Sequence, residues 1–235
     1  MKKLQRTLTL PTAIAISIGG MLSGIFVLPG IAVGITGSSI WLAFLVAALC
    51  ILPAVLSKSE LATAMPKSGG TYVYIERAFG PLFGTVSGLG LWLSLLLKSA
   101  FSLVGLSAYL YVVVQIDESL SKIVALISLG LILILNVFGV KKVGNTQLAI
   151  VSVSIISLLL VIAFGFNSFD SEMLSPVFSG GNSGFISAVA FLYISYAGVT
   201  KVAAVAGEIK NPEKNLPRSM LISLFLITAV YVLVA

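Results

Sequence analysis

The stretch GGMLSGIFVLPG at residues 19–30 lies inside the first long apolar run of the chain. It places Gly19, Gly20, Ser23 and Gly24 near the middle of a run that is long enough to cross a bilayer. A glycine in a helix interior costs about 1 kcal/mol relative to alanine. The stretch therefore predicts either a close helix contact or a helix whose winding is opened at this point.

The composition indicates an integral membrane protein. Of the 235 residues, 58% are hydrophobic and 9% are charged, and the mean hydropathy is +1.13. Soluble domains carry about a quarter charged residues, whereas apolar runs of about 18 or more residues are typical of membrane-spanning helices. The chain has no histidine and one cysteine, Cys50. These counts exclude histidine triads, a disulfide framework and a His/Cys metal site, so we expect no metal, no cofactor and no enzymatic activity.

The pattern predicts an all-α membrane protein with a short helix at TYVYIERAF, which would either lie at the cytoplasmic interface or be a solvated connecting helix; we favour the connecting helix. Seven apolar segments are expected, at roughly residues 10–36, 39–57, 81–114, 121–140, 143–166, 184–207 and 217–235. The first continues to about Thr36, so we expect a retained helix in place of a cleaved signal peptide.

The charges orient these segments. With a cytoplasmic N-terminus, eleven of the fourteen Lys and Arg residues, Lys2 and Lys3 among them, lie in inside segments. The expected outside loops hold Lys122 and the acids Asp117, Glu118, Asp170 and Glu172. The positive-inside rule therefore predicts a multi-pass protein with a cytoplasmic N-terminus. The short loops and the lack of an obvious targeting segment suit the cell (inner) membrane. Topology accounts for the net charge of +6, and no nucleic acid partner is expected.

A second break is predicted at SYAGVT, residues 195–200, about halfway through the sixth segment. Interrupted helices in two halves of a chain point to a transporter's midplane site, because a half-helix N-terminus attracts an anion and freed carbonyls accept bonds from an ammonium group. Close packing is the alternative, because Gly20–Gly24, Gly30–Gly34 and Gly84–Gly88 all have the GxxxG spacing.

Four blocks in order, GGMLSGIFVLPG, ERAFGPLFG, NVFGVKKVGNTQ and AGEIKNPEKNLPRSM, resemble the amino acid–polyamine–organocation transporter superfamily. The resemblance implies a leucine-transporter-like fold of two inverted five-helix repeats, with discontinuous helices one and six. Residues 1–166 would form the first repeat of a single transmembrane domain. Residues 184–235 would begin the second repeat, which stops within helix seven.

The resemblance also implies a substrate site. Backbone N–H groups of Ser23, Gly24 and Ile25 would bind a substrate carboxylate. The amino group would meet carbonyls of helices one and six, and aromatic side chains of helix six would line the pocket. The substrate-binding residues expected on this basis are Ile18, Gly19, Gly20, Ser23, Gly24, Ile25, Phe191, Tyr193, Ile194, Tyr196, Ala197 and Gly198.

Coupling and gating candidates are Lys98, Thr200 and Ser154. Many relatives carry an acid where Thr200 stands and a lysine where Ser154 stands, so these two positions depart from the family pattern. Lys98 lies deep in the third segment, where it would either face the transport path or bond to carbonyls of an opened helix. Lys201 would cap carbonyls or pair with Glu208, seven residues later on one helix face.

We therefore expect secondary transport of amino acids by alternating access, through symport or antiport, with a small-molecule substrate, the lipid bilayer and a coupling proton as partners. The same family leaves open a polyamine or organic amine as substrate. A non-transporting truncated membrane protein is the alternative from another class. The oligomeric state, the coupling ion and the substrate itself stay open.

Overall fold

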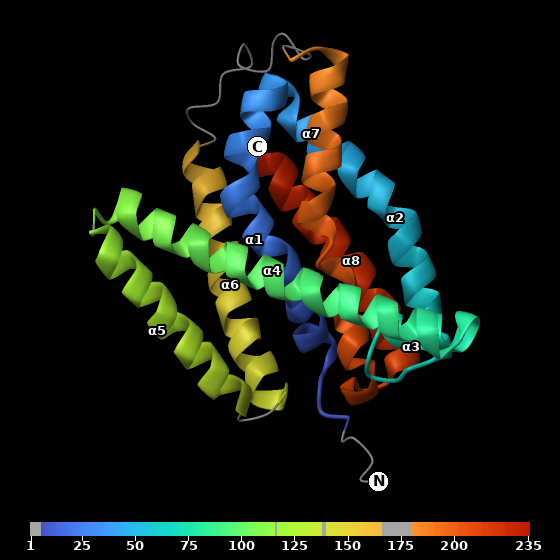
Figure 1. The fold of residues 1–235 in the computed structure, drawn as a ribbon. Helices are drawn as coiled ribbons and strands as arrows, with labels where there is room; N and C mark the ends of the chain where they lie inside the picture. Colours follow the sequence, from blue (N-terminus) through green and yellow to red (C-terminus); the bar gives the residue numbers. More distant parts are fainter. Residues whose placement is uncertain (1–5, 116, 138–139, 166–179) are drawn as a thin grey trace. The chain divides into compact units, whose positions relative to one another are not determined.

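The computed structural model describes residues 6–115, 117–137, 140–165 and 180–235. The described residues are almost entirely helical, as predicted for the all-α fold. The elements, in order, are α1 (Leu10–Thr36), η1 (Gly37–Ser39), α2 (Ile40–Ala64), α3 (Thr71–Phe79), α4 (Pro81–Val113), α5 (Glu118–Val137), α6 (Val140–Gly165), α7 (Gly181–Tyr196), η4 (Val199–Glu208) and α8 (Pro212–Val234) (Figure 1). Lys2, Lys3, Asp170 and Glu172 of the charge argument lie outside the described residues.

Within the described residues, six stretches are long and apolar enough to cross a membrane. They are Leu28–Ala64, Pro81–Val113, Glu118–Val137, Lys142–Gly165, Gly181–Glu208 and Pro212–Val234, and Leu10–Phe26 is a shorter apolar helix. Each apolar segment expected from the sequence corresponds to one or two of the helices. The expected short helix at TYVYIERAF is α3.

The chain divides into two compact units. One comprises Met1–Gly70 and Gly144–Ala235, and the other comprises Thr71–Val143. The first unit takes residues from both predicted repeats, and the repeat boundary itself stays a prediction.

Helices α1, α2, α7 and α8 pack side by side in the first unit (Figure 1). Three fully buried aromatic side chains, Phe44, Tyr196 and Tyr231, lie at the centre of this packing. The ring centroids of Phe44 and Tyr231 are 4.9 Å apart, and those of Tyr196 and Tyr231 are 5.4 Å apart. Large aromatic rings in such contact bury much apolar area, so this cluster joins α2, α7 and α8.

Backbone hydrogen bonds tie three segments together at one end of this unit. The Leu8 N–H donates to the Glu208 carbonyl, and the Lys210 N–H donates to the Leu8 carbonyl, both at 2.9 Å. The Gly69 N–H donates to the Ala204 carbonyl at 3.0 Å. The N-terminal segment and the loop after α2 are therefore both attached to η4 and its C-terminal end.

The second unit contains α3, α4 and α5. Gly84 and Gly88 of α4 lie against α3: added Cβ atoms would be 2.7 Å from the Glu76 Cβ and 3.0 Å from the Tyr72 ring. The hydrogen bond to Glu76 raises the pKa of Tyr72. This GxxxG pair therefore serves close packing.

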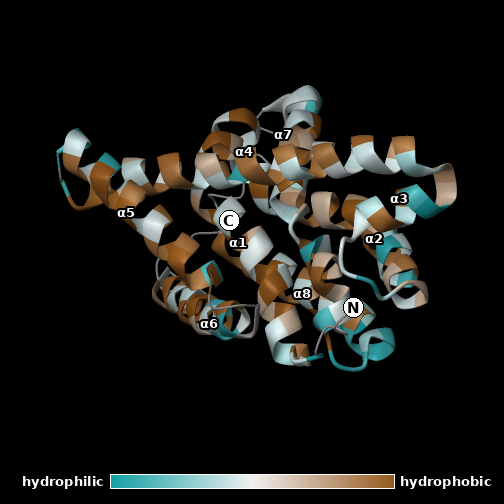
Figure 2. Ribbon diagram, turned by 60° about the horizontal axis from the view of Figure 1, so that its bottom comes forward, coloured by the Kyte–Doolittle hydropathy of each residue, from teal (hydrophilic) through white to brown (hydrophobic). Residues whose placement is uncertain are grey.

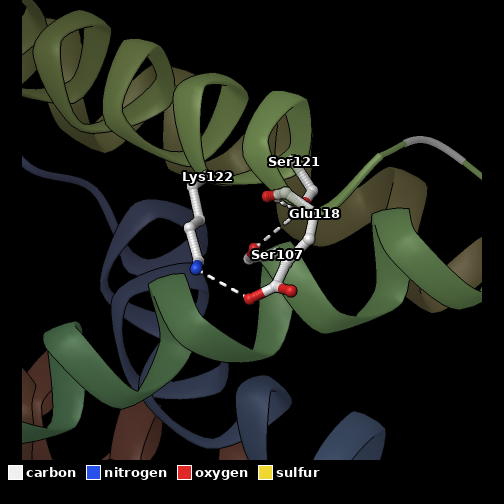
Figure 3. Close-up of polar contacts among 4 residues, drawn as sticks. All are labelled: Ser107, Glu118, Ser121 and Lys122. Carbon is white, nitrogen blue, oxygen red and sulfur yellow. Dashed lines mark hydrogen bonds and ion pairs between the residues drawn. The ribbon is translucent and has the colours of Figure 1, made fainter.

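A hairpin of α4 and α5 completes the second unit. Ser107 and Ser121 join the two helices through a hydroxyl–hydroxyl bond of 3.0 Å, beside the exposed Lys122–Glu118 ion pair of 2.7 Å (Figure 3). Figure 2 shows apolar residues along both helices. Leu82 and Val104 of α4 are 73% and 67% exposed within the chain, as expected for helices whose solvent is lipid.

Helix one requires a correction. The predicted interruption is absent, because α1 is α-helical from Leu10 to Thr36 without a break, with Pro29 inside it. The glycines near its middle meet other helices at van der Waals distance or closer, and this packing offsets their low helix propensity.

Candidate substrate site

The site is built around the point where α1 meets the end of α7. Gly20 and Gly198 lie in direct backbone contact there, and a Cβ added to Gly198 would overlap the carbonyl group of Gly20. Both residues are buried. Any larger residue at position 198 would force the two helices apart.

The next turn of α1 repeats this close approach. A Cβ on Gly24 would lie 2.8 Å from both the Cβ and the Oγ of Ser195. On another side of α1, a Cβ on Gly19 would clash with the Gln147 side-chain amide of α6. Gly19, Gly20 and Gly24 therefore each serve contact with a different partner residue.

Two buried hydroxyls near this crossing have no hydrogen-bond partner among the described residues, those of Ser17 and Ser195. Buried polar groups are nearly always bonded to protein or water. Unpaired hydroxyls beside a helix break are what a site for a polar ligand requires. Ser195 is a residue that the sequence reasoning missed, although the spacing of Ser195 and Gly198 on one face was visible.

Helix six is interrupted, as predicted. The α-helix ends at Tyr196, and the chain continues from Val199 to Glu208 as 3-10 helix that is kinked at Val205, where φ is -109° and ψ is 20°. Runs of 3-10 helix longer than three or four residues are uncommon, and a mid-helix stretch often marks a hinge. The break is therefore a tightening of the helix, since Ala197 and Gly198 keep right-handed helical backbone angles.

Two tyrosine hydroxyls bond to backbone carbonyls beside the site. Tyr231 donates to the Met21 carbonyl of α1 at 2.6 Å, and Tyr196 donates to the Phe44 carbonyl of α2 at 3.1 Å. These bonds connect α8 to α1 and α7 to α2. Tyr196, expected from the resemblance to line the substrate pocket, is thus fully buried within the helix packing.

The other predicted binding residues divide by exposure. Buried or half-buried positions near the crossing are Ile18, Gly19, Gly20, Ser23, Gly24, Ile25, Phe191 and Gly198. Tyr193, Ile194 and Ala197 are exposed. The structure thus brings the glycines of α1 to the break in helix six, and the contacts with substrate stay predictions.

Two of the coupling candidates, Thr200 and Ser154, lie in the first unit, and Lys98 lies in the second. Thr200 is half-buried and accepts a hydrogen bond of 3.2 Å from the Lys58 ammonium of α2. Ser154 is half-buried on α6 in the same unit, whereas Lys98 belongs to α4 of the second unit. Lys58 is a second residue that sequence reasoning missed, because its contact joins positions 142 residues apart.

The predicted Lys201–Glu208 pair is absent from the ion pairs of the described residues. Residues seven apart lie about 20° apart around an α-helix axis but about 120° apart at three residues per turn. Because the segment is 3-10 and is kinked at Val205, the spacing of seven does not place the two side chains on one face. Lys201 instead packs on α1, with its Cδ 2.9 Å from where a Gly20 Cβ would be.

Comparison with known proteins gives the family. The amino acid permease family matches residues 12–235. The chain is 28% identical to the serine/threonine exchanger SteT of Bacillus subtilis over 98% of its length and 54% of the relative. It is 29% identical to the branched-chain amino acid permease BcaP of the same organism, over 100% of the chain and 54% of the relative. It is 30% identical to the cystine/glutamate transporter of Pongo abelii, over 98% of the chain and 49% of the relative.

The chain thus spans about half the length of the relatives that it matches. These relatives are named as exchangers, permeases and transporters, which agrees with the expectation of a protein that is not an enzyme. Three observations point to the same family: the apolar helices, the tightened helix six and the match over residues 12–235. The chain is a multi-pass membrane protein and belongs to the amino acid permease family.

Proposed function

We propose that the chain acts in secondary active transport of amino acids by alternating access at the α1–α7 crossing. The observation that carries this proposal is the backbone contact of Gly20 with Gly198 where helix six changes from α to 3-10. A scaffold or remnant has no need of a kinked 3-10 segment in the second half of the span Gly181–Glu208. This feature favours transport over the non-transporting alternative.

Substrate binding would require α1 to open locally. The N–H groups of Ser23, Gly24 and Ile25 lie within the continuous helix, where each bonds to the carbonyl four residues earlier. Opening this turn would free them for a carboxylate, and the neighbouring glycines lower the cost of opening. The unpaired hydroxyls of Ser17 and Ser195 would supply further polar contacts.

The 3-10 segment offers a source of movement. The six residues before the kink at Val205 rise about 12 Å as a 3-10 helix and about 9 Å as an α-helix. Conversion would therefore shorten Val199–Ala204 by about 3 Å. Because Leu8 and Gly69 are bonded to the far part of this segment, the change would pull on both, which supports a role for this end as a gate.

The substrate class is an amino acid in this proposal. The relatives' names refer to serine/threonine, branched-chain amino acids and cystine/glutamate. A polyamine or organic amine is the variant within the family. We favour an amino acid over an amine because Thr200 stands where many relatives carry an acid. The charge distribution supports a cytoplasmic N-terminus, and the short loops suit an inner-membrane location.

A proton is the proposed coupling ion, and Lys98 is the candidate for carrying it, because a lysine in a spanning helix is costly unless it has a function. Lys98→Met should remove the pH dependence of uptake into proteoliposomes while substrate exchange persists. An unchanged pH profile in this variant would exclude Lys98 from coupling.

Binding of a labelled amino acid and amine panel to the purified 235-residue chain tests the function. Gly24→Leu should abolish binding, because the added side chain meets Ser195. Gly34→Leu is the matched control, because nothing lies within 4 Å of a Cβ at that position. Ser195→Ala keeps the packing and should weaken binding about fivefold, the effect of one hydrogen bond.

Every outcome of these binding measurements either supports or contradicts the proposed substrate site. Specific binding that survives Gly34→Leu and is lost in a monodisperse Gly24→Leu chain supports the site. If Gly24→Leu leaves the chain unfolded, the Ser195→Ala result decides instead. Absence of binding to the folded wild-type chain, or equal binding by all variants, contradicts the proposal.

A further inference from the structure

A groove lies between α4 and α5, near the connection that joins the two helices. Its volume is about 650 Å³, which is within the range of small-molecule sites. All of its lining residues come from these two helices of the second unit. Glu118 lines it at the first turn of α5, and Leu126 lines it eight residues later, so the groove follows the helices for about 12 Å.

The floor of the groove is closed by packed small residues. Ser121 of α5 is fully buried there. Its hydroxyl donates to the Glu118 carbonyl at 2.9 Å, and it accepts from the Ser107 hydroxyl of α4 at 3.0 Å. Both hydroxyls are thus paired within the protein, so the floor requires no polar partner from a ligand. Farther from the connection the lining is apolar and consists of Leu103, Val104, Ala125 and Leu126.

The end of the groove near the connection carries charges of both signs. Figure 3 shows the Lys122 and Glu118 side chains extending from α5 toward α4, with the ammonium and the carboxylate 2.7 Å apart. Both side chains are exposed, and an exposed ion pair adds little to stability, so it can open toward a ligand at low cost. Asp117, the preceding exposed residue, adds a second carboxylate. One cation therefore stands beside two anions, which disfavours a ligand with only negative charge.

The groove has the same order of polarity as one leaflet of a membrane. Helices α4 and α5 are both long and apolar enough to cross a bilayer. The ends of such helices lie at the level of the lipid head groups, and their middle parts lie among the acyl chains. The charged end of the groove is near the helix ends, and its apolar lining lies deeper along the helices. A ligand that fits this order has a charged head and an apolar chain.

We propose that the groove binds one membrane phospholipid whose head group carries a phosphate and a primary ammonium. The phosphate would accept a hydrogen bond from the Lys122 ammonium, and the lipid ammonium would donate to the Glu118 carboxylate. Charge-assisted bonds of this kind are stronger than bonds between neutral groups. One acyl chain would lie over the closed floor, against Leu103 and Leu126. The site does not depend on the proposed transport function.

Three lipids with identical oleoyl chains test the choice of head group. The delipidated 235-residue chain in detergent is titrated with dioleoyl phosphatidylethanolamine, phosphatidylcholine or phosphatidylglycerol, and bound lipids are counted by native mass spectrometry. Phosphatidylethanolamine should bind saturably at one site, at least about fivefold more tightly than the other two lipids. The choline ammonium has no N–H group to donate to Glu118, and phosphatidylglycerol has no cation.

Four variants test the position of the lipid. Glu118→Gln should abolish the preference for phosphatidylethanolamine over phosphatidylcholine. Asp117→Asn is the matched control and should retain it, because Asp117 is the neighbouring exposed acid and does not line the groove. Lys122→Met should weaken both lipids alike, because both phosphates lose the same donor. Ala108→Phe, at an exposed position of the groove wall, should weaken all three lipids by filling the space.

Several outcomes would overturn the lipid site. Equal affinity for the three lipids, or unchanged binding by Ala108→Phe, would exclude it. Tightest binding of phosphatidylglycerol would make an anionic lipid the occupant. Dimerisation that Ala108→Phe abolishes and phosphatidylethanolamine does not reverse would place a second copy of the chain in the groove. These measurements use no amino acid, so the lipid site and the proposed transport function fail or stand separately.

Discussion

The two halves of α1 carry the same glycine spacing in different surroundings. Gly20 and Gly24, in the first half, meet Gly198 and Ser195 at distances that leave no room for a methyl group. For Gly30 and Gly34, in the second half, no atom of the described residues lies within 4 Å of an added Cβ. The GxxxG pattern alone therefore does not locate a helix contact.

What distinguishes the halves is the partner helix. Beside the first half, small residues also stand on the partner side, Ser195 of α7 and Gly198 of the turn that follows it, so two backbones approach each other. Near the C-terminal end of α1, the glycine at the close contact belongs to α7 and not to α1. An added Cβ on Gly184 of α7 would lie 2.7 Å from the Ile35 carbonyl. A close contact requires small residues where the two helices face each other, and Gly34 does not face α7.

The largest expected effect comes from Gly198→Ala. Its methyl group would overlap the Gly20 carbonyl, and backbone cannot move aside as a flexible side chain can. We expect the free energy of unfolding to fall by about 3 kcal/mol, measured by denaturant titration of the purified chain in detergent. An unfolding curve within error of the wild type would show that α1 and α7 do not touch here.

Sequence reasoning predicted part of this comparison. It gave the bounds of α1 and α3 and the break in helix six, because long apolar runs and helix-breaking residues are local signals. It could not choose between packing and opening for Gly20 and Gly24, since that depends on α7, about 175 residues away in the chain. The Lys58–Thr200 bond was out of reach for the same reason.

The error over Lys201 and Glu208 has a different origin. Their separation of seven predicts a shared face only if the helix is an α-helix, and the segment is a 3-10 helix. Its sequence, VTKVAAVAGE, contains no residue that excludes the α form. The tightening therefore reflects packing against α1, α2 and α8, a tertiary effect that local propensity does not report.

A smaller effect is expected from Gly24→Ala. The added Cβ would lie 2.8 Å from the Ser195 side chain and 3.0 Å from its Cα, so the neighbour must shift. We expect a loss of about 1–2 kcal/mol in unfolding free energy. A double-mutant cycle with Ser195→Gly measures the contact, because removing the serine side chain should recover most of the loss. Strict additivity of the two changes would place the cost of Gly24→Ala elsewhere.

Tyr231→Phe tests a second contact of the first half of α1, the hydrogen bond from α8. The substitution keeps the buried ring and removes the 2.6 Å bond to the Met21 carbonyl. A hydrogen bond of this kind contributes about 1 kcal/mol net, so the unfolding free energy should fall by that amount. Tyr111→Phe is the control, because Tyr111 is a tyrosine of α4 that is 55% exposed, and it should cost less. Equal losses of unfolding free energy in both variants would show that the bond to the Met21 carbonyl makes no specific contribution to stability.

The smallest effect, opposite in sign, is expected from Gly34→Ala. The new methyl group meets nothing within 4 Å, and alanine is favoured over glycine inside a helix. The unfolding free energy should therefore rise by about 0.5–1 kcal/mol, seen as a shift of the denaturation midpoint with unchanged slope. The same substitution is thus destabilising at Gly24 and stabilising ten residues later on one helix. A loss at Gly34 would mean that this half of α1 also has a close partner, and the contrast between the halves would fail.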